Sequence, residues 1–303
     1  MPEAALTQGL IAATLRHMPE DGMAATALPN LTIFRAQGPT DSVPILHKPA
    51  VCLIVQGAKR VMLGTEVFLY DAATYFVVSV DLALSGQVIQ ATPDQPYLCL
   101  RFDLDLYGIN DLLFGLDLGK AEGREAGPGA FLSPVTAPLQ DAFLRLLGLL
   151  DRPADQPVLG PLIEREILYR LLTGPQGARL RQLARPGSRD ARIGRAIGWI
   201  KANYRDTLRV AEVADAAGMS PSALHLYFKQ MTQMSPLQYQ KHIRLQEARR
   251  LILAEGMDAA SAGFSVGYES PSQFSREYRR LFGAPPRRDT DRLRADPTAG
   301  ATL

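Results

Sequence analysis

The sequence predicts an α+β fold with two domains, an antiparallel β-barrel or sandwich followed by a helical hairpin and then an all-α domain. Short runs rich in β-branched and aromatic residues fill residues 31–102. Leucines and isoleucines three and four residues apart dominate most of the chain after that segment. The balance of charge also changes sign between the two parts. A chain of 303 residues is long enough to form two hydrophobic cores.

The β-rich segment contains six predicted strands with turn residues between them. Glycines and the pairs Ser85-Gly86 and Pro93-Asp94 separate runs that are too close together for helices to connect them. The pattern therefore indicates antiparallel pairing, in a barrel of about residues 30–118. The strands are expected at Val51–Val55, Arg60–Leu63, Glu66–Tyr70, Tyr75–Val80, Gln87–Gln90 and Tyr97–Phe102.

Helical spacing follows the barrel. Residues 138–150 and 161–172 each place Leu and Ile on one face, which predicts two helices within about 135–173, joined by a Pro-rich connection. These helices complete a domain of residues 1–178. Residues 179–189 are predicted to be a linker to a helical domain of residues 190–290, which a tail at 291–303 follows.

The charge is divided unevenly along the chain. Residues 1–178 contain 12 Lys and Arg against 19 Asp and Glu, whereas residues 179–303 contain 21 against 12. The net charges are therefore −7 and +9. A basic domain of this kind indicates a polyanionic partner, although a solvated basic surface is the alternative.

The sequence offers little sign of export, membrane insertion or metal binding. Glu3 comes early, and the N-terminus lacks the cationic leader and apolar core of a secretory signal. No apolar run reaches the roughly 18 residues that a membrane-spanning helix needs. Cys52 and Cys99 are the only cysteines and have no CxxC spacing, so neither a disulfide framework nor a structural zinc site is indicated. We expect a soluble cytoplasmic protein without a cofactor.

The C-terminal part repeats itself at an offset of 50 residues. Ser220–Pro236 reads SPSALHLYFKQMTQMSP, and Ser270–Pro286 reads SPSQFSREYRRLFGAPP. In each copy the first Ser is placed to cap a helix and the next Pro to begin it. Upstream, small residues and Gly218 or Gly267 fit a tight turn after a short helix. The repeat predicts two helix-turn-helix units.

The second helix of such a unit enters the DNA major groove with the side that faces away from the protein core. The core-facing side is marked by two residues four apart in each copy, Leu224 and Phe228 in the first and Phe274 and Tyr278 in the second. Arg276 is the strongest base-reading candidate, because its fork can bind guanine, although it can instead pair with Glu277 or Glu269. The base-reading candidates are Ser222, Ala223, His225, Leu226, Ser272, Gln273, Ser275 and Arg276.

Residues 236–254 are expected to form a long helix between the two units, which would let one chain read two successive major grooves. Hydroxyl and basic side chains near both units can hold phosphates, but Arg250 on this helix can instead pair with Glu247. The phosphate candidates are Ser220, Lys229, Arg244, Arg249, Ser270, Arg279 and Arg280.

Residues from about 190 to 290 resemble the DNA-binding domain of AraC/XylS-type transcription regulators. The resemblance lies in VADAAGMSPSALHLYFK, IRLQEARRLIL and VGYESPSQFSREYRRLFGAPP, which have the spacing of the family. It implies seven helices in two subdomains, transcriptional control, and duplex promoter DNA and RNA polymerase as partners. One departure is Gly263, where the family usually has Ala.

The N-terminal part is similar to AraC-type N-terminal domains with a cupin-like β-fold. The similar segments are residues 49–57, Ser79-Val80-Asp81 and Pro96-Tyr97. This similarity implies that the barrel senses an effector and that the helices near 138–172 form a homodimer. The leucine-rich faces of those helices are also the candidate dimer interface that the sequence itself indicates.

Several hypotheses remain for the barrel. A cupin-type metal enzyme or binding module would need converging histidines, but residues 1–178 contain only two. No nucleophile elbow, phosphate loop or dinucleotide fingerprint occurs, so an enzyme is not expected. The cysteines are either inert core residues or detectors of a thiol-reactive signal, and a small organic effector is a further hypothesis. The sensor candidates are Cys52, Cys99, His47, Gln56, Tyr75 and Arg101.

Overall fold

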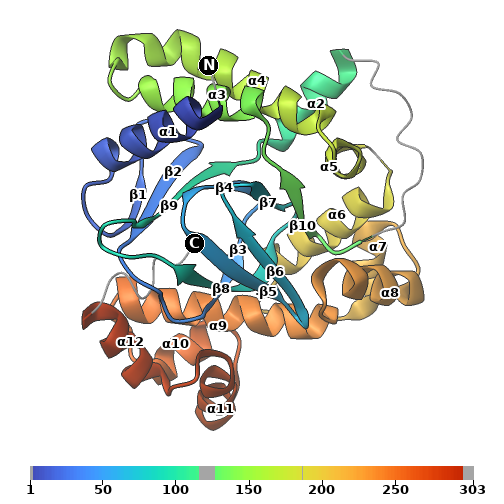
Figure 1. Cartoon of the computed structure of the whole chain (residues 1–303). Coiled ribbons are helices and arrows are strands. Elements are labelled where there is room, and N and C mark those ends of the chain that lie inside the picture. Colours follow the sequence, from blue (N-terminus) through green and yellow to red (C-terminus); the bar gives the residue numbers. More distant parts are fainter. Residues whose placement is uncertain (1–2, 116–126, 186, 296–303) are drawn as a thin grey trace.

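The computed structural model describes residues 3–115, 127–185 and 187–295, and it has the α+β fold with two domains that the sequence predicts. Figure 1 shows a β-sandwich with helices above it and further helices below and beside it. Within the described ranges, no helix is long and apolar enough to cross a membrane.

The sandwich consists of two antiparallel sheets. Six strands form the larger sheet in the order β1-β2-β9-β4-β7-β10, and four form the smaller one in the order β3-β8-β5-β6. The six predicted strands are all present as β4 to β9. The strands are β1 (Gly22–Ala25), β2 (Leu31–Ala36), β3 (Val43–His47), β4 (Ala50–Gln56), β5 (Ala58–Leu63), β6 (Glu66–Asp71), β7 (Thr74–Val78), β8 (Leu82–Gln90), β9 (Tyr97–Asp103) and β10 (Ala130–Pro134).

Glycine lets the chain pass from the larger sheet to the smaller one. β4 has a bulge between Ile54 and Gln56, and Gly57 follows it with a φ of +87°. A Cβ atom on Gly57 would lie 2.5 Å from the carbonyl oxygen of Gln90. Only glycine fits this turn, because both the backbone conformation and the space exclude a side chain.

Helices cover the outer face of the larger sheet, where α3 and α4 form the predicted hairpin. α4 begins earlier than expected and contains Pro161. The predicted linker also differs, because it contains much of α5, which buries Leu180 and Ala184 in the same core. The helices are α1 (Glu3–His17), α2 (Leu106–Gly115), α3 (Ala137–Gly148), α4 (Gln156–Thr173) and α5 (Gly177–Ala184), with a short 3₁₀ turn at Pro153–Asp155.

The C-terminal domain has seven helices in the described residues, as the resemblance implies. α9 has the predicted bounds, whereas α12 extends past the predicted end of the domain at residue 290. The rest of the predicted tail, residues 296–303, lies outside the described residues. The helices are α6 (Arg189–Ala202), α7 (Val210–Ala217), α8 (Pro221–Thr232), α9 (Pro236–Ala254), α10 (Ala259–Ser265), α11 (Pro271–Phe282) and α12 (Pro286–Ala295).

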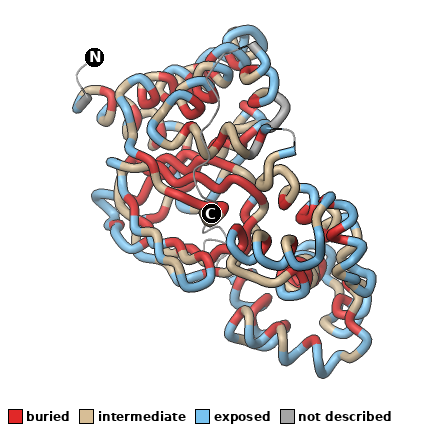
Figure 2. Tube along the Cα trace, turned by 90° about the vertical axis from the view of Figure 1, so that its right-hand side faces the viewer, coloured by how far each residue is buried: buried red, intermediate tan, exposed pale blue. Residues whose placement is uncertain are grey.

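The first helix-turn-helix unit shares a hydrophobic core with the sandwich. Buried side chains between the two sheets belong to one cluster with buried side chains of α6, α7, α8 and α9, and Figure 2 shows the buried segments gathered there. Asp81 links the domains, since its carboxylate lies 2.6 Å from the Lys201 ammonium and its carbonyl accepts from the Tyr239 hydroxyl at 2.9 Å. The amide of Gly129 also donates to the carbonyl of Met231 at 2.8 Å.

The second unit has a hydrophobic cluster of its own and meets the sandwich through polar contacts. Gln246 donates to the carbonyl of Pro44 at 2.8 Å. Arg292 lies 3.2 Å from the carboxylate of Asp41, which precedes β3. The two units are therefore attached to the sandwich in different ways, the first by a continuous core and the second by its surface.

Candidate nucleic-acid interface

The first unit is built from α7 and α8 as the sequence predicts. Gly218 ends α7 in the left-handed conformation, with a φ of 65°. Ser220 caps α8, because its hydroxyl accepts from the amide of Ala223, and Pro221 takes the first turn, where a missing N–H costs nothing.

The second unit, α10 and α11, has the same design with a longer turn. Asp258 caps α10 and Ser270 caps α11, each by accepting from backbone amides. Gly267 in the turn has a φ of +93°, and a Cβ atom there would lie 2.3 Å from the carbonyl oxygen of Arg205. The glycine is therefore required by a close contact between the two units as well as by the turn.

Both second helices are fixed by one buried side. Leu224, Phe228, Phe274 and Tyr278 have no solvent exposure at all, which is the predicted arrangement of core-facing positions four residues apart. The opposite side of each helix is open. All eight predicted base-reading positions lie outside the buried side, and all are exposed except Ala223, which is half-buried.

The Arg276 side chain has no partner within the described residues. It is exposed and forms no ion pair or hydrogen bond within the described residues, so the alternative pairing with Glu277 or Glu269 does not occur there. Glu277 is instead bound by Lys241 at 2.7 Å and by the Tyr268 hydroxyl at 2.8 Å.

Among the described residues, the arginines without a partner concentrate on α11 and α12. Most basic side chains in the described ranges pair with a carboxylate or donate to another oxygen. Of the arginines that do neither, all but Arg185 lie on these two helices. Exposed cations without counter-charges favour binding to a polyanion. The five on α11 and α12 are Arg276, Arg279, Arg280, Arg287 and Arg288.

Two predicted phosphate contacts are corrected by the structure. Arg249 is buried, and its Nε lies 2.9 Å from the carboxylate of Asp289, so it cannot reach a phosphate. Arg244 is half-buried and donates to the carbonyls of Tyr204, Asp206 and Gly267 at 2.6 to 2.9 Å. Both guanidinium groups hold the protein together.

The other phosphate candidates lie near the surface. Lys229, Arg279 and Arg280 are exposed and have no ion pair within the described residues, and the hydroxyls of Ser220 and Ser270 are engaged in capping. On α9, Arg250 pairs within the helix, as the alternative to a phosphate contact predicts: it donates to Glu247 at 2.8 Å.

A cluster of polar side chains lies between the sheets, in the region where an effector is expected. The cluster contains both cysteines. Cys52 Sγ lies 3.7 Å from Nε2 of His47, whose Nδ1 donates to the carbonyl of Lys48. Arg101 faces the same side of the sheet, where it pairs with Asp103 at 2.9 Å.

The two thiols differ in acidity. A hydrogen bond from Cys52 to Cys99, followed by burial, raises the pKa of Cys52. The same bond, together with the nearby charge of Lys59, lowers the pKa of Cys99. The shared hydrogen bond therefore makes Cys99 the more acidic of the two buried thiols.

Two sensor candidates are not part of this cluster. Tyr75 points to the other face of the larger sheet, because it is one residue out of phase with Phe76, the residue that pairs with Cys52. Gln56 is half-buried and donates to the carbonyl of Pro96 at 2.8 Å. Strand alternation separates Tyr75 from the cysteines.

Three further side chains of this cluster, Lys59, Tyr70 and Tyr97, are not among the predicted sensor residues. All three are buried beside the cysteines, and Lys59 Nζ lies 5.8 and 6.0 Å from the ring centres of Phe34 and Tyr97. Burial lowers the pKa of Lys59. The signal was present in the sequence, since Lys59 is in phase with the inward-facing Val61 and Leu63 of β5.

No group of three or more His, Cys, Asp or Glu side chains that could hold a metal occurs in the part of the chain that the structure describes. His17, the other histidine of the N-terminal domain, lies on α1 and contacts Asp151 at 3.3 Å.

Comparison with known families agrees with this geometry. Residues 27–179 match the N-terminus of AraC-type transcriptional regulators, and residues 213–292 match a helix-turn-helix domain. The chain belongs to the AraC-type transcriptional regulators. The curated relatives that this AraC-type chain matches include a transcriptional regulator and transcriptional activators.

The chain spans about half the length of the curated relatives that it matches. It is 30% identical over 149 residues to the transcriptional regulator ArgR of Pseudomonas aeruginosa, which is 49% of this chain and 45% of ArgR. It is 29% identical over 144 residues to the transcriptional activator RhaS of Escherichia fergusonii, which is 47% of this chain and 51% of RhaS.

Solved structures of ToxT from Vibrio cholerae show the same fold. One, from strain O395, aligns with 90% of this AraC-type chain and 98% of its own, with a TM-score of 0.60 and 9% identity. Another, from strain SCE256, aligns with 89% and 95%, with a TM-score of 0.55 and 11% identity.

The departure of this AraC-type chain at Gly263 has a structural reason. A Cβ atom there would lie 3.0 Å from Cγ of Phe274. In the first unit Ala214 and Leu224 are the matching buried pair. The absence of a side chain at Gly263 on α10 thus leaves room for the larger ring of Phe274 on α11.

Proposed function

We propose that this protein is a sequence-specific DNA-binding transcription regulator whose N-terminal domain senses a small-molecule or thiol-reactive signal. The observation that carries the proposal is the exposed side of α8 and α11. It presents polar and basic side chains that have no counter-charge among the described residues, and the opposite side of each helix is anchored in a core.

Bases and phosphates have different readers in this proposal. Arg276 forms two hydrogen bonds to a guanine, and a pair of this kind discriminates between bases by about 1–3 kcal/mol. Lys229 and Arg280 neutralise phosphates, which adds affinity for every sequence alike. Promoter DNA and RNA polymerase are the proposed partners, which places the protein in the bacterial cytoplasm.

Binding of the purified full chain to genomic DNA fragments at several salt concentrations tests the proposal. We expect a subset of fragments to bind, with an affinity that falls as salt rises. Arg276→Ala should weaken the preferred fragments and relax the preference at one position, whereas Lys229→Ala should weaken all fragments similarly. Failure to bind any fragment above background at low salt, or affinity that is indifferent to salt, refutes the proposal.

The cluster around Cys52 and Cys99 supports the sensing part. It combines an acidic thiol, an amine and a guanidinium group in a core that continues into the first helix-turn-helix unit. One ToxT structure contains an unsaturated fatty acid. That ligand is not carried over to the present chain, because the likeness to ToxT extends to the fold only.

Cys52→Ser and Cys99→Ser separate the two kinds of signal. If the signal reacts with a thiol, at least one variant should lose the transcriptional response in cells and keep DNA binding in vitro. A normal response from both variants contradicts thiol sensing and leaves the small-molecule hypothesis.

We also propose a homodimer through α4. Four of its apolar side chains are exposed although the helix packs on α3, and they recur at helical spacing. An exposed apolar stripe of this kind is typical of an interaction surface. The stripe consists of Val158, Leu159, Leu162 and Tyr169.

A further inference from the structure

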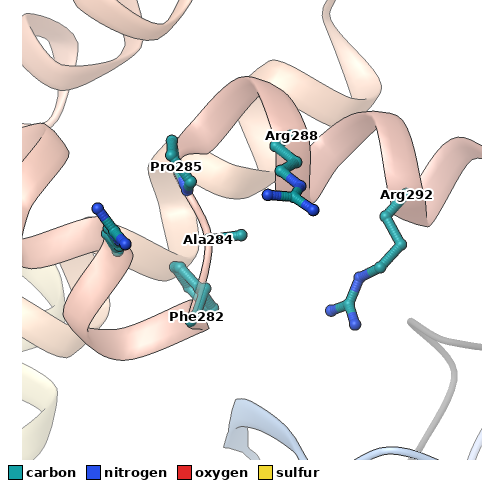
Figure 3. Close-up of a pocket in the computed structure, with 7 residues that line it drawn as sticks. Phe282, Ala284, Pro285, Arg288 and Arg292 are labelled. Carbon is teal, nitrogen blue, oxygen red and sulfur yellow. The ribbon is translucent and has the colours of Figure 1, made fainter.

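A cavity of about 620 Å³ lies where α11 meets α12, and three arginines line it. Figure 3 shows Arg288 and Arg292 extending from α12 to the same side, beside the turn that carries Phe282, Ala284 and Pro285. The remaining lining residues are Arg279 and Gly283.

Within the part of the chain that the structure describes, few counter-charges lie near the arginines of this cavity. Arg279 and Arg288 form no ion pair within the described residues. Arg292 lies 3.4 Å from Asp289, but both oxygens of that carboxylate already serve Arg249 and the Tyr278 hydroxyl. The cavity therefore concentrates positive charge and donors in a shape that suits a phosphate, since guanidinium groups bind phosphate oxygens in pairs.

The cavity continues the side of α11 that faces solvent. Gln273, Arg276 and Arg279 follow one another at intervals of three residues and are all exposed, so they lie along one side of the helix. Arg279 ends this row at the cavity. In a helix-turn-helix complex the bases are read from the first turns of the recognition helix, which places the backbone of the DNA beside the surrounding basic groups.

The only carboxylate outside the C-terminal domain that engages these arginines is Asp41, among the residues described. Asp41 contacts Arg292 at 3.2 Å, and its side chain is 76% exposed. An exposed ion pair of this kind is weak and is screened by salt, so another anion can displace it. The barrel domain thus holds one of the three arginines in a contact that DNA can replace.

We propose that this cavity binds a backbone phosphate of DNA, next to the bases that α11 contacts, through Arg279, Arg288 and Arg292. We also propose that Asp41 competes with the DNA for Arg292. This inference rests on the proposed function, because it assumes that α11 reads DNA. It adds two phosphate ligands on α12 that the repeat does not contain, and a direct competition between the sensor domain and DNA.

The test uses the full chain and a fragment that the wild-type protein binds. Arg288→Gln removes one cavity arginine. Arg185→Gln is the matched control, because Arg185 is also exposed and without an ion pair within the described residues but lies outside α11 and α12. Dissociation constants are measured from 0.05 to 0.3 M KCl, so that the salt concentration changes roughly sixfold and a slope can be determined.

We expect Arg288→Gln to make the slope of log K against log[KCl] less negative by about 0.9. The variant should then bind roughly eightfold more weakly than the wild type at 0.1 M salt if the two bind equally at 1 M. Arg185→Gln should change both quantities much less. Equal effects of the two variants overturn the proposal, because a general loss of positive charge would then explain them. If the wild-type protein binds no fragment at all, the proposed function fails instead.

A second arm separates DNA from a free anion. Inorganic phosphate is titrated into the DNA-free protein at constant ionic strength. If Arg288→Gln abolishes phosphate binding but leaves DNA affinity and salt slope at the wild-type values, the cavity serves a soluble anion and the proposal is overturned.

A double-mutant cycle tests the competition. Asp41→Asn should tighten DNA binding in the wild-type background and have little effect in the Arg292→Gln background. If Asp41→Asn tightens binding equally in both backgrounds, the effect is a general change of charge and the competition for Arg292 is refuted.

Discussion

The buried ion pair between Arg249 and Asp289 is expected to stabilise the second unit. The Arg249 side chain is 8% exposed and Asp289 is fully buried, with 2.9 Å between Nε and the carboxylate. The Tyr278 hydroxyl donates to the same carboxylate at 2.9 Å. The guanidinium also stacks on Phe282, with 4.4 Å to the ring centre. The pair therefore joins α9, α11 and α12.

Replacing Arg249 by Met removes the charge and keeps much of the side-chain volume. The carboxylate of Asp289 then stays buried without a counter-charge, and removal of one partner of a buried pair typically costs about 3–5 kcal/mol. Since about 1.4 kcal/mol is tenfold in an equilibrium constant, amide hydrogen exchange in the second unit should become at least about a hundredfold faster.

Hydrogen exchange of the full chain, read for the amides of α9, α11 and α12, measures this effect. Arg250→Met is the matched control, because Arg250 lies next to Arg249 but forms an exposed pair with Glu247. Such a helical pair contributes about 0.2–0.5 kcal/mol, so the control should exchange almost like the wild type. Wild-type exchange in Arg249→Met, combined with a smaller salt slope of DNA binding, would falsify the burial argument and restore Arg249 as a phosphate contact.

Three further predictions concern other parts of the molecule. Cys52→Ala removes the hydrogen bond that lowers the pKa of Cys99, so alkylation of Cys99 by iodoacetamide should set in at higher pH than in the wild type, and an unchanged pH profile contradicts this. If α4 forms the dimer interface, Leu162→Glu should yield a monomer in light scattering, and an unchanged mass excludes this interface. Gly263→Ala should lower the free energy of unfolding by about 1–3 kcal/mol through its contact with Phe274, and adding Phe274→Leu should restore it. If the double variant instead loses the sum of the two single-variant losses, the sizes of the two side chains are not coupled.

Local patterns in the sequence predicted most of the fold. The strands β4 to β9 alternate or are continuously apolar, and turn residues bound them, so each could be identified by itself. β1, β3 and β10 are short and lack such a pattern: β1 reads GMAA, and β3 and β10 each contain a proline. Their pairing depends on strands far away in the chain. α5 was missed because ARPG next to it indicates a loop, whereas Leu180 and Ala184 are held by the core of the sandwich domain.

The site was predictable to the extent that it depends on helix geometry. One buried side with a four-residue spacing fixes the exposed side of α8 and α11, and the predicted readers lie there. The partners of Arg244 and Arg249 were not predictable, because the oxygens that bind them are about 23 to 40 residues away in the sequence. The same holds for the cavity, since Arg279 and Arg292 come together only through the turn at Gly283.

The way in which the two units are attached to the sandwich has a consequence for regulation. The first unit shares its core with the residues around Cys52 and Cys99, and close-packed cores transmit a change of volume. A ligand or a modification between the sheets can therefore alter the packing of α6 and α8 directly. The second unit has its own core and touches the barrel through Asp41 and Pro44. Its orientation depends on these weak contacts and on Arg244, which ties it to the first unit. A signal in the barrel should thus reach the first recognition helix through packing and the second through release or retention of polar contacts.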